Sequence, residues 1–279
     1  MPLVPTASLV TAAPRGVVAF NVITLEHAEA IVAGAETAGR PVVLQVSENA
    51  VRFHSGRVGP IAAACRALAA ASAANVALHL DHVTSVELLH SAPGHGFGSV
   101  MYDTTGLPYD DNVTATRAAA EFAHGRGLWL ESELGTVGGK DGAPPLPAHA
   151  PGARTAPDAA ASYAESTGVD ALAVAVGSTH AMTTRDAELD HDLIAALAAA
   201  VPVPLVLHGS SGVPDDELVR AVAGGIVKVN IGTALNVAFT GAVRSRLDAD
   251  AVVVDPRKYL KPARDAMAET VAHFLLLLA

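Results

Sequence analysis

The sequence predicts a single (β/α)8 barrel over residues 1–279, and three observations support this prediction. Eight apolar runs have the length of β-strands, alanine-rich segments of helical pattern lie between them, and polar residues gather where the runs end. Strands that alternate with helices at this spacing form parallel sheets, and eight such units in one chain favour closure into a barrel. The active site of that fold lies at the carboxyl ends of the strands.

The expected strands are short and apolar, which suits a parallel sheet buried on both faces. They are residues 17–22, 42–47, 76–81, 98–103, 128–133, 170–177, 203–208 and 225–231. The clearest helical segments between them are residues 26–39, 112–127 and 191–201. Because parallel strands need crossover connections, each unit is expected to be right-handed.

Composition and charge indicate a soluble, cytoplasmic protein with a large core, since 51% of its residues are hydrophobic and 16% are charged. No run is long enough to span a membrane, and the start of the chain does not resemble a signal peptide. The single cysteine, Cys65, lies in an alanine-rich helical run and is expected to be a buried core residue. A net charge of −10 leaves no basic stripe for nucleic-acid phosphates, so no nucleic-acid partner is expected.

Three histidines stand at or just after the ends of expected strands: His82, His180 and His208. Three imidazoles that converge from separate strands make an open zinc site, although other divalent metals also accept imidazole ligands. His79 stands before the end of its strand, so we expect it to be packed within the barrel.

Carboxylates stand beside these histidines. Asp81 directly precedes His82 and is a candidate general base, or else a carboxylate that orients a histidine ligand. Adjacent strand residues point to opposite faces, so the backbone must turn if both are to reach one cavity. Glu133 and Asp103 end two other strands, where each is a candidate ligand of the metal, or of a second metal, or a hydrogen-bond partner of a neighbouring strand end.

A phosphate site is expected after the last two strands, where this barrel commonly builds one. Gly209 allows close backbone approach, Ser211 and Thr233 offer hydroxyl groups, and the following helix presents free N–H groups. Arg257, in the basic segment 255–262, is a second candidate anion ligand or else part of a surface salt bridge.

One long connection, residues 138–157, is rich in Gly, Pro and Ala. Its length is typical of a mobile lid, although a surface insertion explains it as well. His149 within it is interpreted as a solvent-exposed residue rather than a ligand.

The motifs together resemble those of the class II ketose-bisphosphate aldolases, in particular the tagatose-bisphosphate and short fructose-bisphosphate branch. The segments that carry the resemblance are AFNV (19–22), LHLDH (78–82), SVMYD (99–103), ESELGTVGG (131–139), GVDALAVAVGSTH (168–180), LVLHGSSGVP (205–214), KVNIGT (228–233) and DPRKY (255–259). The resemblance implies a zinc-dependent retro-aldol cleavage of a ketose 1,6-bisphosphate, with dihydroxyacetone phosphate as one product. It also allows a monovalent cation as a second cofactor.

The resemblance also implies roles for individual residues. It makes His82, His180 and His208 the zinc ligands, Asp81 the catalytic acid/base, and Glu133 the ligand of a displaced metal. The substrate-binding positions that match, together with strand-end residues expected to line the cavity, are Asn21, Ser47, Ala181, Gly209, Ser211, Asn230, Thr233 and Arg257. Ala181 stands where the family usually has glycine, and Asp141 stands at the lid position where the family carries a glutamate that transfers a proton.

Several alternatives remain at this stage. The substrate is expected to be fructose 1,6-bisphosphate, with tagatose 1,6-bisphosphate or an intermediate of inositol breakdown as alternatives. Two alternatives are more remote. One is a non-catalytic sugar-phosphate-binding subunit, and the other is an aldolase that forms a Schiff base through Lys228. A homodimer or homotetramer is expected, and no membrane partner.

Overall fold

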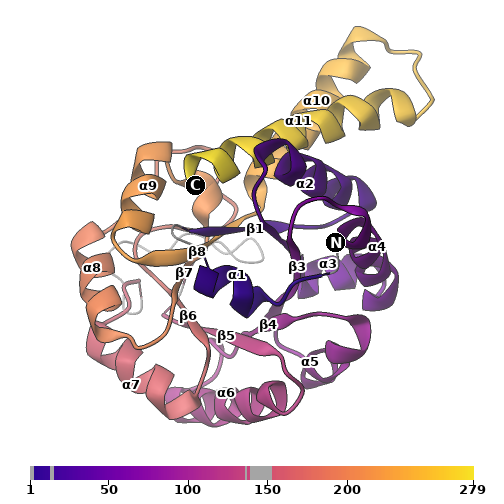
Figure 1. Cartoon of the computed structure of the whole chain (residues 1–279). Helices are drawn as coiled ribbons and strands as arrows, with labels where there is room; N and C mark the ends of the chain where they lie inside the picture. Colours follow the sequence, from indigo (N-terminus) through magenta and orange to yellow (C-terminus); the bar gives the residue numbers. More distant parts are fainter. Residues whose placement is uncertain (1–2, 13–15, 136, 139–152) are drawn as a thin grey trace.

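Eight parallel strands close into a barrel in the computed structural model of the chain, which describes residues 3–12, 16–135, 137–138 and 153–279 (Figure 1). Strands consecutive in the chain are neighbours, and β8 returns to pair with β1, with Asn230 opposite Ala19. The strands are β1 (Val17–Asn21), β2 (Val42–Ser47), β3 (Val76–Val83), β4 (Ser99–Tyr102), β5 (Trp129–Leu134), β6 (Ala171–Val174), β7 (Leu205–Leu207) and β8 (Ile226–Ile231). The predicted (β/α)8 fold is confirmed.

Each predicted strand is present, and the largest differences in bounds have local causes. β3 runs two residues beyond its predicted end, and its register with β4 shifts between Leu80 and Val83. β6 ends at Val174, three residues before its predicted end, because the N–H of Ala175 donates to the hydroxyl of Thr155 instead of a neighbouring strand. Both differences lie at the carboxyl end of the barrel, where the regular pairing between strands ends.

Helices surround the barrel, and one of them covers its amino end (Figure 1). The helices are α1 (Thr6–Ala12), α2 (Leu25–Ala38), α3 (Glu48–Phe53), α4 (Val58–Ala71), α5 (Val86–Ser91), α6 (Tyr109–His124), α7 (Pro157–Thr167), α8 (His191–Ala200), α9 (Asp215–Ala223), α10 (Thr233–Ala249) and α11 (Arg257–Leu277). Local signals set their ends: α2 follows Thr24, which forms a capping box with His27, and ends at Gly39 in the left-handed conformation. Cys65 on α4 is fully buried, as predicted, and is not part of a disulfide.

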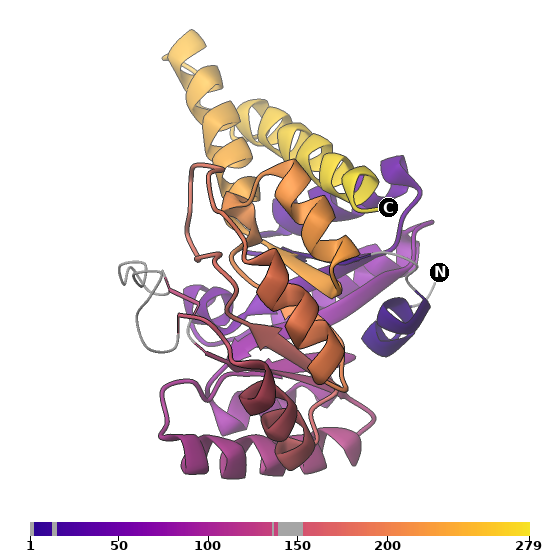
Figure 2. The same cartoon turned by 90° about the vertical axis from the view of Figure 1, so that its left-hand side faces the viewer.

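Helix α1 covers the amino end of the barrel, on the molecular axis in Figure 1 and to one side in Figure 2. Its Leu9 and Val10 belong to a second apolar cluster with inward-facing strand residues such as Ala19, Val43 and Val206. This cluster is separate from the larger core between the strands and the outer helices. Helix α1 therefore closes the end of the barrel opposite to the strand carboxyl ends.

Helices α10 and α11 form an antiparallel pair that extends away from the barrel (Figures 1 and 2). The carboxyl-terminal half of α11 packs against the outside of the barrel, where Met267, Val271 and Phe274 are buried. The distal part is exposed, and Val252 and Val254 between the two helices are 86% and 88% exposed. Among the described residues, no helix combines the length and the apolar character that crossing a membrane requires.

Candidate active site

Four side chains converge at the carboxyl end of the barrel with the chemistry of metal ligands. His82, Glu133, His180 and His208 each offer one ligand atom, and these atoms lie within 4.8 Å of one another. The residues come from β3, β5, the segment after β6 and the segment after β7. The three predicted histidines therefore do meet, and Glu133 joins them.

The backbone turns at His82, and this brings two adjacent residues into one cavity. His82 has a φ of 47°, a left-handed conformation that is uncommon for residues other than glycine. The register shift between β3 and β4 occurs at the same place. Asp81 and His82 therefore both line the cavity, although regular strand geometry would have pointed them to opposite faces.

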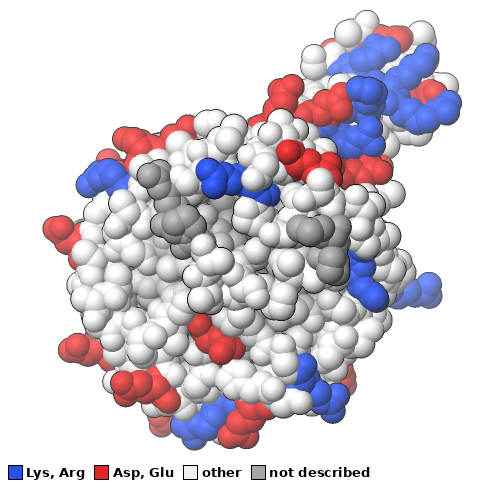
Figure 3. All heavy atoms as spheres, in the orientation of Figure 1, with Lys and Arg blue, Asp and Glu red and all other residues white. Residues whose placement is uncertain are grey.

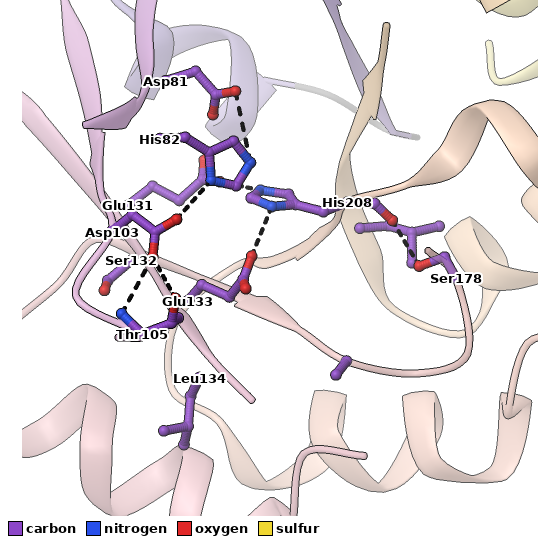
Figure 4. Close-up of polar contacts among 12 residues, drawn as sticks. Asp81, His82, Asp103, Thr105, Glu131, Ser132, Glu133, Leu134, Ser178 and His208 are labelled. Carbon is purple, nitrogen blue, oxygen red and sulfur yellow. Dashed lines mark hydrogen bonds and ion pairs between the residues drawn. The ribbon is translucent and has the colours of Figure 1, made fainter. Parts of the chain in front are cut away.

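Two carboxylates hold the ring of His208, which is fully buried (Figure 4). Its Nε2 lies 2.9 Å from Oε1 of Glu131, and its Nδ1 lies 2.9 Å from Oε2 of Glu133. Burial by itself would lower the pKa of His208, but the hydrogen bonds to Glu131 and Glu133 outweigh it and raise the pKa to about 9. His208 thus lies between two carboxylates that favour its protonated form.

Behind His208 lies a buried polar layer, in which Glu131 and Gln45 were not predicted from the sequence, whereas Lys228 was expected to face the barrel interior. Lys228 lies inside the barrel, fully buried, and its Nζ donates to Glu131 at 2.7 Å and to Gln45 at 3.3 Å. Burial alone would raise the pKa of Glu131, but Lys228 and His208 lower it well below the usual range. One signal was available: Glu131 and Glu133 are two residues apart in β5, so both face the barrel interior.

This arrangement of Lys228 disfavours the Schiff-base alternative. The Nζ atom already has two hydrogen-bond acceptors in a fully buried position. A lysine that forms a Schiff base must present its amine to the substrate, whereas the Nζ of Lys228 is fully buried and lies 2.7 Å from a carboxylate oxygen of Glu131.

Asp103 is placed beside the metal-ligand group but outside the set of four. Its Oδ2 lies 2.9 Å from Nδ1 of His82, and its Oδ1 accepts hydrogen bonds from the N–H and hydroxyl of Thr105 (Figure 4). Because an ionised carboxylate only accepts, Nδ1 of His82 carries the hydrogen and Nε2 keeps its lone pair. This is the role of a carboxylate that orients a histidine ligand.

The donor set fits a divalent metal. Asp103 orients His82 through Nδ1, and Glu131 orients His208 through Nε2, so that Nδ1 of His208 faces Glu133. Three imidazoles and one carboxylate are the ligand types that zinc and other first-row divalent metals accept. Nδ1 of His208 and Oε2 of Glu133 are two such ligand atoms, and they lie 2.9 Å apart.

A cavity of about 310 Å³ opens beside these residues. Ten of the residues predicted from the sequence line it: Asn21, Ser47, Asp81, His82, His180, Ala181, Gly209, Ser211, Asn230 and Thr233. Gln45 and Asn236 also line it and were not predicted. Asp141 and His149 lie outside the described residues.

Asp81 is buried beneath the cavity and held by an amide. Its side chain is 1% exposed, and Nε2 of Gln45 donates to its Oδ2 at 3.0 Å. Gln45 also donates to Asn21, so the amide links two cavity residues. Burial alone would raise the pKa of Asp81, but the neighbouring His82 and His208 lower it. Asp81 is therefore an ionised carboxylate that can accept a proton.

Features of an anion site lie at the start of α10. The hydroxyl of Ser211 accepts hydrogen bonds from the N–H groups of Gly232 and Ala234. Gly209 has a φ of 67°, and a Cβ there would lie 2.6 Å from backbone atoms of Thr179, so only glycine fits. Ala181 adopts a φ of 60° at the rim. A helix N-terminus beside close-packed backbone is suited to bind phosphate.

Arg257 lies away from this cavity. It begins α11 at the distal end of the α10–α11 pair, where its side chain is 88% exposed and forms an ion pair with Asp255 at 2.8 Å. The structure thus places Arg257 in a surface salt bridge, and within one chain it does not meet the other predicted substrate-binding residues.

Comparisons with known proteins point to one family. The family model described as class II fructose-bisphosphate aldolase matches residues 7–279. A fructose-bisphosphate aldolase of Staphylococcus aureus (strain Mu50) is 37% identical over 254 residues, which cover 90% of this chain and 87% of that protein. One from Geobacillus stearothermophilus is 37% identical over 279 residues, covering 97% and 95%.

A solved structure shows the same architecture. The YdjI aldolase of Escherichia coli K12 has a TM-score of 0.84 and 29% sequence identity, covering 99% of this chain and 97% of that one. The fold and the site thus define a lyase with a candidate metal centre at the carboxyl end of a (β/α)8 barrel. The chain belongs to the class II fructose-bisphosphate aldolase family.

Proposed function

We propose that the protein catalyses the reversible cleavage of fructose 1,6-bisphosphate to dihydroxyacetone phosphate and glyceraldehyde 3-phosphate, with zinc as its metal. The observation that carries the proposal is the group of four ligand residues beside the buried carboxylate of Asp81. A bound metal would polarise the substrate carbonyl and stabilise the negative charge on the three-carbon fragment. His82, His180, His208 and Glu133 would hold it.

The residues of the chain supply the remaining chemistry. In the cleavage direction Asp81 takes the proton of the hydroxyl next to the breaking bond, and in condensation it returns that proton to the new alkoxide. Gln45 keeps the carboxylate in place through its hydrogen bond to Oδ2. Gly209, Ser211 and Thr233, beside the N-terminus of α10, would bind the phosphate of the three-carbon fragment.

Fructose 1,6-bisphosphate is proposed ahead of its epimer because both sequence relatives carry the name fructose-bisphosphate aldolase. Tagatose 1,6-bisphosphate shares the same three-carbon half and is the substrate to compare with it. A cytoplasmic location fits an enzyme that acts on sugar phosphates. The monovalent cation remains a prediction.

We also propose that the working enzyme is a homo-oligomer in which Arg257 serves a second copy. Arg257 is separated from the cavity of its own chain by the length of the projecting helices (Figures 1 and 2). The projecting pair carries exposed basic residues, seen as the blue group in Figure 3, around exposed Val252 and Val254. An arm of this kind can bring a cation to the acidic body of another copy, where it would contact the far phosphate.

The test of the proposed reaction is release of dihydroxyacetone phosphate from each bisphosphate, before and after EDTA treatment and again after zinc is restored. Activity that EDTA abolishes and zinc restores supports the proposal, and the ratio of kcat/KM identifies the preferred epimer. Activity that survives complete metal removal, together with borohydride trapping of Lys228, would overturn the metal mechanism.

The test of the Arg257 proposal is complementation. Arg257→Ala and Asp81→Asn chains, each weakly active alone, are unfolded or exchanged together and assayed. A mixed oligomer holds a site with an intact Asp81 and an intact arm from the other chain, so recovery of activity is expected. Absence of recovery in mixed oligomers, with both chains shown to be present, contradicts the proposal.

A further inference from the structure

A chain of three buried side chains connects the amino end of the barrel to the catalytic carboxylate. His79, in the middle of β3, is fully buried, and its Nδ1 lies 2.7 Å from the hydroxyl of Ser99 on β4. That hydroxyl lies 2.5 Å from the hydroxyl of Thr6, which is also fully buried. Thr6 is the first residue of α1, the helix that closes the barrel. The chain therefore reaches from the sealed end towards the active site.

The other nitrogen of His79 faces Asp81. Nε2 of His79 lies 3.8 Å from Oδ1 of Asp81, and among the described residues neither atom has a hydrogen-bond partner. The two residues are two positions apart in β3, so both side chains point into the barrel. Buried polar atoms without partners are costly. Two of them that face each other, one on an imidazole and one on a carboxylate, call for an explanation.

The direction of the hydrogen bonds follows from electrostatics. His79 is neutral, because burial, aided by the nearby Lys228, lowers its pKa to about 3. If Nδ1 carried the hydrogen, the lone pair of Nε2 would face the carboxylate of Asp81, and both atoms would remain unsatisfied. In the other arrangement Thr6 donates to Ser99, Ser99 donates to Nδ1, and the Nε2–H group faces Oδ1 of Asp81. The second arrangement is favoured, because it turns a donor rather than a lone pair towards the carboxylate of Asp81.

We propose that His79 is a positioning residue for Asp81, and that Ser99 and Thr6 fix its tautomer from the far end of the barrel. Gln45 holds Oδ2 of Asp81 and the Nε2–H group of His79 faces Oδ1, so the carboxylate is oriented from two sides. The 3.8 Å separation shortens to a hydrogen bond when the substrate is bound, since such contacts are often long in ligand-free enzymes. This inference rests on the proposed role of Asp81 in proton transfer.

The test compares two substitutions at His79. The Gln side chain places an amide N–H close to the position of Nε2, so it can still donate a hydrogen bond to Asp81. The shorter Asn side chain reaches only as far as the position of Nδ1 and cannot donate to Asp81. We expect kcat for cleavage to fall by about tenfold more in His79→Asn than in His79→Gln, the effect of one hydrogen bond to a charged group. Zinc affinity, measured by competition with a chelator, should be equal in the two variants.

A half-reaction separates positioning from general damage. Exchange of a carbon-bound hydrogen of dihydroxyacetone phosphate with solvent deuterium needs the metal and the phosphate site, but not the hydroxyl proton that Asp81 transfers. His79→Asn should therefore slow cleavage and leave this exchange within about twofold of the wild type. Equal loss of cleavage and exchange would show that His79 only supports the structure, and would overturn the proposal.

The far end of the chain gives the sharpest variant. Thr6→Val keeps the shape of the side chain and removes the hydroxyl, and it should lower kcat about threefold with no loss of zinc affinity. The matched control is Thr11→Val on the same helix, because the Thr11 hydroxyl is exposed and donates to the backbone carbonyl of Ala7. An effect of Thr6→Val no larger than that of Thr11→Val would contradict the coupling.

Nitrogen NMR of histidine-labelled protein tests the tautomer without any activity measurement. The resonances of His79, assigned by their loss in His79→Gln, should show a protonated Nε2 and an unprotonated Nδ1. Ser99→Ala should disturb this state. The opposite tautomer would overturn the proposal even if the enzyme cleaves the expected sugar. Correct NMR results with no cleavage of either bisphosphate by the wild type would instead refute the proposed function, and with it the role assigned to His79.

Discussion

The two ends of the barrel are built from different chemistry. At the carboxyl end, four buried or half-buried ligand residues lie within 4.8 Å of one another, and strand geometry breaks down around them. At the amino end, Leu9 and Val10 of α1 close the barrel through apolar contacts. A polar layer that contains His79, Glu131 and Lys228 lies between the two ends. The comparison indicates that the carboxyl end holds the charged and strained residues that the reaction needs, while the apolar contacts at the amino end contribute stability.

Backbone conformation follows the same division. Of the three non-glycine residues with positive φ among the described part of the chain, His82 and Ala181 line the cavity. Strained residues persist only where the surrounding structure determines them, and they cluster at functional sites. The amino end contains no such residue within its described segments. Outside the chain formed by Thr6, Ser99 and His79, substitutions at the two ends should therefore have separable effects on activity and stability.

The largest effect is expected for Asp81→Asn. The amide cannot accept the hydroxyl proton, so kcat should fall by about 10³-fold, within the usual range for a general acid/base. Zinc affinity and melting temperature should change little, since Asp81 is not one of the four ligands. Steady-state kinetics and chelator competition measure both. Asp265→Asn makes the same charge change at an exposed position on α11 and should leave kcat unchanged. A fall below tenfold in Asp81→Asn would remove Asp81 from the proton-transfer step.

The next effect tests the polar layer. Lys228→Met removes the ammonium group that lies 2.7 Å from the buried carboxylate of Glu131, which should cost about 3–5 kcal/mol of unfolding free energy. The double substitution with Glu131→Gln removes both charges and should recover most of that stability. It should not recover metal binding, because a neutral amide in place of the Glu131 carboxylate no longer fixes the tautomer of His208, and zinc affinity should remain about 10–100-fold weaker.

Denaturant titration and chelator competition on the two variants and the wild type measure stability and zinc affinity independently. If the double variant regained both stability and zinc affinity, the polar layer would have only a structural role.

Local patterns predicted the strands, because a parallel strand buried on both faces reads as an apolar run wherever it lies in the chain. They also predicted the three histidines, since strand ends of this fold share one face. They did not predict Lys228 with Glu131 as a pair, because that contact joins β8 to β5 across the barrel and depends on closure. Arg257 was predicted as a phosphate ligand, yet no local pattern shows that α10 and α11 project from the barrel.

A substitution at the amino end should change stability and not activity. Leu9→Ala removes a side chain that is 6% exposed in the apolar cluster under the barrel. A loss of about 2–3 kcal/mol is expected, at the lower end of the range for buried leucines because α1 lies at the surface. The kcat of the folded protein should stay within about twofold, since Thr6 keeps its hydrogen bond to Ser99.

Leu276→Ala is the matched control, because that side chain is 59% exposed and should cost little. Thermal unfolding and kinetics at a temperature well below the transition check the pair. A large fall in kcat for Leu9→Ala would show that the two ends are not separable.

The smallest effect is expected for Ala181→Gly. Ala181 has a φ of 60°, where the Cβ of an alanine costs about 1–2 kcal/mol and glycine costs nothing. The greater freedom of glycine in the unfolded chain offsets part of this gain, so the variant should be more stable by about 0.5–1 kcal/mol. Ala63→Gly, at an exposed position inside α4, should have the opposite sign by about 1 kcal/mol. Because glycine retains the backbone N–H at the cavity rim, kcat/KM should stay within about twofold. If Ala181→Gly destabilised the protein as Ala63→Gly does, the left-handed conformation at this position would carry no strain. The carboxyl end would then differ from the amino end in its charged groups and not in backbone strain at Ala181.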